Sequence, residues 1–426
     1  MSQESEPWNR QRLRSNNERL LLARLRAEGP ASRAQLARAT GLSKPTVSSA
    51  LAALEEAGLV REAGRQAPPE RGRVAVLYEP DPTAGYVLGL DIGRAWLRVA
   101  AADLDGTVVA RAEVRNRGRS AAAMADLAIA AARRVVADAG VDPALVAHTV
   151  VGAPGVYDPE RRRVRYAGNL PGWGRAGLLD RMREELGTPL SVHNDANLAA
   201  LGEYTFGAGR GSRLFVYVLV GTGLGMGVVA DGRLFTGAHG AAGEIGFLPL
   251  LPRVGGPDPY GPRGLKGQGL KGQGLKGQGL KGQGLEGQQG LEGAVAAEAV
   301  VRAARELGMS GTRSEPLTAK AVFDAARDGV APALEAVRQE AERLAHVIAA
   351  VAAVLDPDLV VLGGGVGHSA DLLLRTVELT LQRIGPLRPR VAASALGENA
   401  VLLGAVATGL EAAREQVFTR TREGGG

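Results

Sequence analysis

The stretch YVLGLDIGRAWLRVAAADLDG, residues 86–106, decides the fold class of this 426-residue chain. Its first half is an apolar run that ends at Asp91 and Gly93, as a buried strand does where it enters a glycine turn. Its second half continues through Asp105-Gly106 into another apolar segment, and this pattern predicts a hairpin. The segment therefore predicts the first strands of a sheet.

Strands and helices alternate behind this segment. Helices are predicted at 120–139, 293–307, 318–328 and 332–354. Strands that end in small or polar residues are predicted within 148–155, 189–197, 213–234 and 359–366. Such alternation is typical of α/β architecture, so we expect an α/β domain over residues 85–412 and a flexible tail at 413–426.

Composition excludes several classes of site. The chain has no cysteine, so it forms no disulfide and offers no thiolate to a metal, and its five histidines lack the spacing of metal ligands. No apolar run reaches the roughly 18 residues that a membrane span needs, and the N-terminus lacks the apolar core of a secretion signal. We therefore expect a cytoplasmic protein without a metal site.

The first 80 residues have the pattern of a winged helix-turn-helix. Residues 16–28 carry apolar side chains at helical spacing, and Gly29-Pro30 ends that helix. Ser32 and Ser43 are expected to cap two more helices, the second running from Lys44 to about Ala57. Two short strands, at 59–62 and 74–78, predict a wing with its loop at 64–73. The predicted domain spans residues 16–80, after a disordered segment at 1–15.

Basic charge is concentrated in this N-terminal unit, where 13 Lys and Arg face nine Asp and Glu in residues 1–80. This excess suits a protein that binds the DNA backbone, although a solvated basic surface is the alternative. Helices that read bases present their first turns to the major groove, and a basic wing tip suits phosphates or a narrow minor groove. The candidate DNA-binding residues are Arg33, Gln35, Ser43, Lys44, Thr46, Ser48, Ser49, Arg71 and Arg73.

A five-residue repeat interrupts the α/β domain. From Gly264 the unit GLKGQ occurs four times and is followed by GLEGQ, within a low-complexity insert at 255–289. A period of five with two glycines per unit fits neither a helix nor a strand, so we expect a flexible insert. A tolerated expansion of a surface loop is the simpler interpretation, and part of a pocket lid is the alternative.

Seven glycine-rich or polar motifs occur in a fixed order: LGLDIG (88–93), GAPG (152–155), AGNLPGW (167–173), HNDANLAALGE (193–203), VGTGLGMG (220–227), AAGEIG (241–246) and LGGG (362–365). As a set they resemble the ROK family of repressors, open reading frames and kinases. With the winged helix, the chain resembles the branch of xylose and N-acetylglucosamine repressors. The resemblance implies a two-lobed actin-like ATPase or sugar-kinase fold of ribonuclease H-like topology.

The resemblance also assigns a sugar site. A sugar kinase needs a carboxylate within hydrogen-bond reach of the attacking hydroxyl, and Asp195 matches that catalytic base. Without the surrounding motifs, a turn or helix cap would be the simpler role for Asp195. Asn194, Glu244 and Glu292 match sugar ligands of the family, and Asn169 is an additional candidate. Carboxylates and amides suit a sugar because each hydroxyl both donates and accepts.

Nucleotide binding requires glycine turns whose N–H groups approach phosphates. The matching positions, which we expect to be vestigial, are Asp91, Gly93, Gly221, Thr222, Gly223 and Gly364. Tight packing of strands on helices is the alternative reason for glycine at these turns.

Two departures from the family pattern affect the expected function. The first phosphate loop of family kinases reads Asp-x-Gly-Gly-Thr, whereas this chain has Arg94 and Ala95 in the last two places. The family's zinc site uses a histidine and a cysteine cluster, whereas this chain has Phe247 and no cysteine. We therefore expect no zinc, and binding of ATP and magnesium that is weak or lost.

These features together predict a sugar-responsive, DNA-binding regulator of carbohydrate-metabolism genes, with a degenerate kinase domain as its sensor. The expected partners are an inverted-repeat operator in double-stranded DNA, a small sugar or sugar derivative, and a second copy of the chain in a homodimer or tetramer. The alternatives are an active ATP-dependent sugar kinase with a DNA-binding head, and a ligand-independent DNA-binding or scaffold protein whose sugar pocket is a relic.

Overall fold

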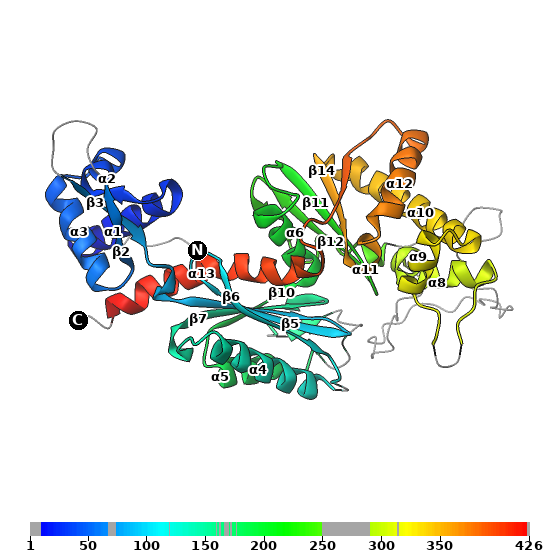
Figure 1. Cartoon of the computed structure of the whole chain (residues 1–426), viewed down its shortest axis with the longest axis horizontal. Coiled ribbons are helices and arrows are strands. Elements are labelled where there is room, and N and C mark those ends of the chain that lie inside the picture. Colours follow the sequence, from blue (N-terminus) through cyan, green and yellow to red (C-terminus); the bar gives the residue numbers. More distant parts are fainter. Residues whose placement is uncertain are drawn as a thin grey trace, which may run out of the picture.

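The fold is described from a computed structural model, over residues 10–66, 74–118, 120–158, 160–161, 163–165, 170, 173–175, 177–248, 290–312 and 315–423. The described chain forms a small N-terminal head and two α/β lobes (Figure 1). A long C-terminal helix passes from the lobes back to the head.

The head has the predicted winged helix-turn-helix. Its elements are α1 (Arg10–Glu28), β1 (Ala31–Ser32), α2 (Arg33–Thr40), α3 (Lys44–Glu56), β2 (Val60–Gln66) and β3 (Ala75–Pro80). The strands form an antiparallel sheet in the order β1-β3-β2. Ser32 and Ser43 cap α2 and α3 as predicted, because each side chain accepts a hydrogen bond from the backbone N–H three residues ahead.

The first lobe is built on a five-stranded sheet in the order β10-β7-β4-β5-β6. Its strands are β4 (Tyr86–Ile92), β5 (Trp96–Asp103), β6 (Val108–Arg115), β7 (Val146–Ala153) and β10 (Leu190–Asn194). The predicted hairpin at Asp105-Gly106 joins β5 to β6, and β7 lies parallel to both β4 and β10. Helices α4 (Ala121–Asp138) and α5 (Leu178–Leu186) belong to this lobe, and a small hairpin of β8 (Val156–Asp158) and β9 (Arg163–Arg165) follows β7.

The second lobe has a sheet in the order β13-β12-β11-β14-β15. Its strands are β11 (Leu214–Val220), β12 (Leu224–Ala230), β13 (Arg233–Leu234), β14 (Leu359–Gly363) and β15 (Arg390–Ala393). Its helices are α7 (Glu292–Val295), α8 (Ala297–Glu306), α9 (Ala319–Arg327), α10 (Ala331–Leu355), α11 (Gly364–Gly367) and α12 (Ala370–Ile384). Short 3-10 turns occur in both lobes: η1 (Pro82–Ala84) and η2 (Pro143–Leu145) precede strands β4 and β7 of the first lobe, and η3 (Ile245–Phe247) and η4 (Gly397–Asn399) follow strands of the second.

Two helices, α6 (Asp195–Phe206) and α13 (Ala400–Glu423), connect the lobes. They cross closely at Gly404 of α13, where an added Cβ would lie 1.7 Å from the carbonyl oxygen of Leu198. α13 and α4 cover opposite faces of the first sheet. Val87 and Ala100 pack with α13, whereas Leu88 and Ala101, one residue further along each strand, pack with α4.

The predicted boundaries at both ends of the chain were wrong. Residues 10–15, expected to be disordered, form the start of α1, since no glycine or proline interrupts the segment from Arg10 to Glu28. Residues 413–423, expected to be a flexible tail, continue α13. Ala413, Val417 and Phe418 are buried there in a core shared by the head and the first lobe, so tertiary packing extends the helix beyond the predicted end. The predicted insert at 255–289 lies outside the described residues. No helix in the described part of the chain is long and apolar enough to cross a membrane.

Candidate DNA-binding face and candidate ligand site

The third helix has one buried and one polar face. Val47, Leu51 and Leu54 are fully buried in the core of the head. On the other side Lys44, Ser48, and Ser49 are exposed, and Thr46 is half-buried. Because these polar side chains stand in the first two turns of α3, they lie where a helix in the major groove contacts bases.

Three of the other DNA-binding candidates have partners within the head. The Gln35 side chain accepts a hydrogen bond from Ser32 N at 2.8 Å and completes a capping box at the start of α2. Ser43 caps α3 and shares a hydrogen bond of 2.8 Å with the hydroxyl of Thr46. Arg33 is exposed and stacks on Tyr78, 4.9 Å from the ring centroid. Arg71 and Arg73, the candidates in the wing, lie outside the described residues.

Asp195, Glu244 and Glu292 come from three separate elements and act on one another electrostatically. Asp195 is the first residue of α6, Glu244 precedes η3, and Glu292 is the first residue of α7. One oxygen of Asp195 accepts from Ala196 N at 2.8 Å, and Oε2 of Glu292 accepts from Leu224 N at 3.2 Å. The structure thus brings together the three carboxylates that the sequence analysis assigned to a sugar.

Burial and the charges of neighbouring carboxylates raise the pKa values of Asp195 and Glu244. Burial raises the pKa of Asp195 to about 6, and the charge of Glu292 adds to the effect. Burial raises the pKa of Glu244 to about 7, with Asp195 and Glu292 contributing repulsion. Near neutral pH, Glu244 therefore populates both its protonated and its carboxylate form. The protonated form can donate a hydrogen bond to a hydroxyl, and the carboxylate can accept one.

Asn194 belongs to the same site and is already held in place. Its side chain caps α6 by accepting from Asn197 N at 3.1 Å, and its Nδ2 donates to the Gly155 carbonyl at 3.2 Å. The remaining sugar candidate, Asn169, lies outside the described residues.

The two glycine turns of the second lobe differ in their surroundings. An added Cβ at Gly221 would lie 3.9 Å from Gly365 N, an added Cβ at Gly365 would meet nothing within 4 Å, and Thr222 is exposed. Gly221 N, however, donates to the Gly223 carbonyl at 2.9 Å. Gly364 has φ of 77°, and an added Cβ would lie 2.5 Å from the Val220 carbonyl oxygen. Close packing and the positive φ therefore explain the glycine at 364, whereas Gly365 borders open space.

In residues 91–95, which match the first phosphate loop of the family, polar groups already have hydrogen-bond partners within the chain. Gly93 N donates to the Trp96 carbonyl at 2.9 Å, and the Gly93 carbonyl accepts from Asn116 Nδ2 at 2.8 Å. Asp91, at the end of β4, is 3.3 Å from Nη1 of Arg98 on β5. Burial raises the pKa of Asp91 to about 7, although the charge of Arg98 opposes the shift. Arg94, within this loop, is exposed.

Arg98 is a residue that the motif analysis missed. Its side chain is 11% exposed, yet it also donates to Glu113 at 2.9 Å and to Glu398 at 2.7 Å. An arginine in an otherwise apolar strand was a signal of such a network, because a buried charge needs partners. Its partners stay hidden in the sequence, since Glu398 is 300 residues away.

Among the described residues, no three His, Asp or Glu side chains form a group that could hold a metal ion. Phe247, at the position of the family's zinc-binding histidine, is 58% exposed. The prediction that zinc is absent rests on the sequence alone.

Comparison with known proteins finds a family match for the two lobes and another for the N-terminal head. A model of the ROK family matches residues 87–411, and a model of the MarR family matches residues 16–73. The glucokinase of Halalkalibacterium halodurans is 31% identical over 343 residues, which cover 75% of this chain and 93% of that protein. The xylose repressor of Bacillus subtilis is 30% identical over 234 residues, or 55% of this chain and 60% of the repressor.

A solved ROK family transcriptional regulator, a homologue of the E. coli MLC protein, has the same fold over nearly the whole length. Its TM-score is 0.70 at 21% identity, with 96% of this chain and 98% of that chain covered. The match confirms the predicted fold class, a winged helix-turn-helix joined to a two-lobed sugar-kinase fold.

Proposed function

The chain belongs to the ROK family and carries a MarR-type winged helix, and on that premise we propose that it is a sugar-responsive repressor of carbohydrate-metabolism genes. The kinase-like domain is the sensor and the head binds the operator. The observation that carries the proposal is the pairing, in one chain, of an exposed polar face on α3 with the Asp195, Glu244 and Glu292 cluster.

The carboxylate cluster supports a neutral polyhydroxyl ligand. Hydroxyl donors can satisfy carboxylates that otherwise repel one another, and a protonated Glu244 can donate in return. A sugar phosphate would add negative charge next to three acidic groups, so the unphosphorylated sugar fits better.

The state of the first phosphate loop supports a sensor rather than a kinase. ATP with magnesium would need the Asp91 carboxylate and the Gly93 N–H, but Arg98 and Trp96 already use them. The residues therefore do not fit a metal–nucleotide at this loop, and Arg94 and Ala95 replace the family's glycine and threonine. In the proposed mechanism, sugar binding shifts the population of lobe arrangements and so changes operator affinity.

The DNA target is an inverted repeat bound by a homodimer, because the twofold symmetry of a protein is mirrored in the spacing of its half-sites. Access to chromosomal operators makes the cytoplasm the proposed location. The first experiment selects duplexes from a random library, then measures their binding with and without glucose, xylose and aminosugars. Sugar-independent affinity, together with thermal stability that no sugar raises, would contradict the sensor.

The base-reading face is tested with Lys44→Ala combined with Thr46→Ala. We expect this variant to weaken binding to the selected duplex by about 10-fold to 100-fold more than binding to random DNA. Arg38→Ala, an exposed arginine on α2, is the matched control for lost charge. Equal losses on both DNAs would remove α3 as the base-reading helix.

Two observations favour a second function, that of an active sugar kinase with a DNA-binding head. Asp195 has the raised pKa, about 6, that suits a general base, and the chain is 31% identical to a glucokinase. A coupled ADP assay with the same sugars separates the two functions. Turnover that Asp195→Asn abolishes would establish the kinase and overturn the sensor-only proposal.

A further inference from the structure

The Glu398 carboxylate connects the two lobes. Its Oε2 accepts from Arg98 Nη2 of the first lobe at 2.7 Å, and its Oε1 lies 2.9 Å from Nδ1 of His368. His368 is the residue after α11, and α11 itself directly follows β14 of the second lobe. The turn η4, which contains Glu398, packs on α11. One carboxylate cannot stay bonded to groups on both lobes when the lobes move apart. A change in the arrangement of the lobes therefore breaks one of these contacts.

Glu398 also lies in η4, two residues before the start of α13, whose far end packs on the head. At about 1.5 Å per residue, the 24 residues of α13 span roughly 36 Å. Near its end, Val417 and Phe418 share a core with Leu21 and Leu25 of α1. Arg19 of α1 pairs with Glu415, and its guanidinium carbon lies 4.4 Å from the centroid of the Phe418 ring. One helix thus has the interlobe contact at one end and the head at the other.

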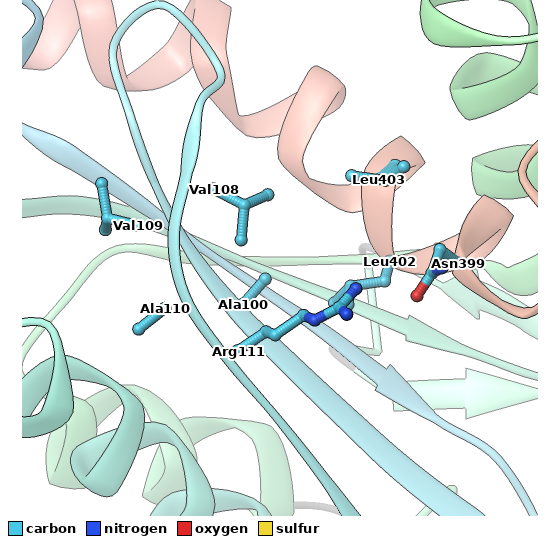
Figure 2. A pocket seen from close by; sticks show the side chains of 8 residues that line it. All are labelled: Ala100, Val108, Val109, Ala110, Arg111, Asn399, Leu402 and Leu403. Carbon is cyan, nitrogen blue, oxygen red and sulfur yellow. The ribbon is translucent and has the colours of Figure 1, made fainter.

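The first turn of α13 has a cavity on one side and close packing on the other, where an added Cβ at Gly202 of α6 would lie 2.3 Å from the Ala400 carbonyl oxygen. A cavity of about 370 Å³ lies between β5, β6 and this turn, with Asn399, Leu402 and Leu403 on the side of α13 (Figure 2). Figure 2 also shows Arg111 of β6 extending toward Leu402 and Asn399. On the cavity side, Glu398 holds the segment before the helix through its contacts with Arg98 and His368.

We propose that Glu398 is an interlobe latch: held between Arg98 and His368, it favours the lobe arrangement of this structure and, through α13, the matching position of the head. The latch deepens the proposed function, since it supplies the regulatory link between sensor and head. Only the regulatory role of the latch depends on the proposed function. The conformational effect itself requires neither a sugar nor DNA.

The distance between the two lobes tests the effect of the latch directly. The chain has no cysteine, so spin labels can be placed at Arg134→Cys on α4 and Val354→Cys on α10, whose native side chains are 77% and 81% exposed. Pulsed electron resonance of the ligand-free full-length protein then gives the distribution of lobe arrangements. We expect Glu398→Gln to raise the population of other lobe arrangements, relative to the arrangement of this structure, about fivefold. This ratio corresponds to the loss of roughly 1 kcal/mol of stabilisation by the carboxylate.

Glu113→Gln is the matched control. Glu113 pairs with the same guanidinium at 2.9 Å, but it lies on β6 within the first lobe and makes no interlobe link. We expect its distance distribution to match that of the unmodified labelled protein. Identical distributions for Glu398→Gln and the unmodified protein, or an equal shift in both variants, would overturn the latch.

Two further measurements test the ends of the proposed link. His368→Leu should produce the same shift as Glu398→Gln, and the double variant no more than either, because both substitutions remove one bridge. Labels at Glu56→Cys in the head and Arg134→Cys should report a changed head position in the same variants. A head position that is unchanged while the lobes shift would refute the role of α13. Failure of the proposed function, by contrast, would appear only in the DNA and sugar assays.

Discussion

Replacing Glu244 by glutamine should stabilise the ligand-free protein at alkaline pH and leave it unchanged at acidic pH. Glu244 is half-buried beside Asp195 and Glu292, and burial with their repulsion raises its pKa from 4.5 to about 7. Glutamine has nearly the same shape as the protonated acid but carries no charge at any pH. The variant therefore removes the cost of ionising this side chain in the folded protein.

The sign and size follow from the proton balance. Between pH 4.5 and 7 the folded protein retains a proton on Glu244 that the unfolded chain has released, so the free energy of unfolding falls as the pH rises. The full shift from 4.5 to about 7 corresponds to about 3 kcal/mol. Because the carboxyl keeps part of its hydration, we expect about 1–2 kcal/mol at pH 8.

Thermal unfolding at pH 5 and pH 8 tests this expectation. The Tm of Glu244→Gln should exceed that of the unmodified protein by about 2–4 °C at pH 8 and match it at pH 5. Glu184→Gln, at an exposed position on α5, is the control for a surface charge and should change neither Tm by more than about 1 °C. An advantage of the same size at both pH values would show that the charge of Glu244 is not the cause, and no advantage at pH 8 would refute its desolvation.

Three other substitutions test the packing. Leu54→Ala, in the core of the head, should cost about 2–5 kcal/mol and lower the Tm of the head, whereas Ala52→Ser on the exposed side of α3 should have little effect. Gly404→Ala should destabilise the protein by about 1–3 kcal/mol because its Cβ would meet the Leu198 carbonyl oxygen at 1.7 Å, whereas Gly385→Ala, with nothing within 4 Å, should be neutral or slightly stabilising. Phe418→Ala should increase hydrogen exchange in α1, and protection equal to that of the unmodified protein would show that Phe418 does not hold the head.

Local features of the structure could be predicted wherever the sequence encodes them within a few residues. Ser32 and Ser43 mark the starts of α2 and α3, and Val47, Leu51 and Leu54 at helical spacing mark the buried face. Gln35 shows how such signals compete. Its position three residues after Ser32 is the pattern of a capping box, and that local bond engages the side chain that we had assigned to DNA.

Features that depend on distant contacts could not be predicted in this way. The end of α13 is set by packing on α1, almost 400 residues earlier, because Arg19 and Glu415 are separated by 396 positions. Asp195, Glu244 and Glu292 were assigned through ordered motifs, since no local rule brings three like charges together. Arg98 lies in the stretch that predicted the fold, but its charge has meaning only with Asp91, Glu113 and Glu398 in place. A buried arginine in an apolar strand is therefore itself a prediction: it requires acidic partners that only the fold can identify.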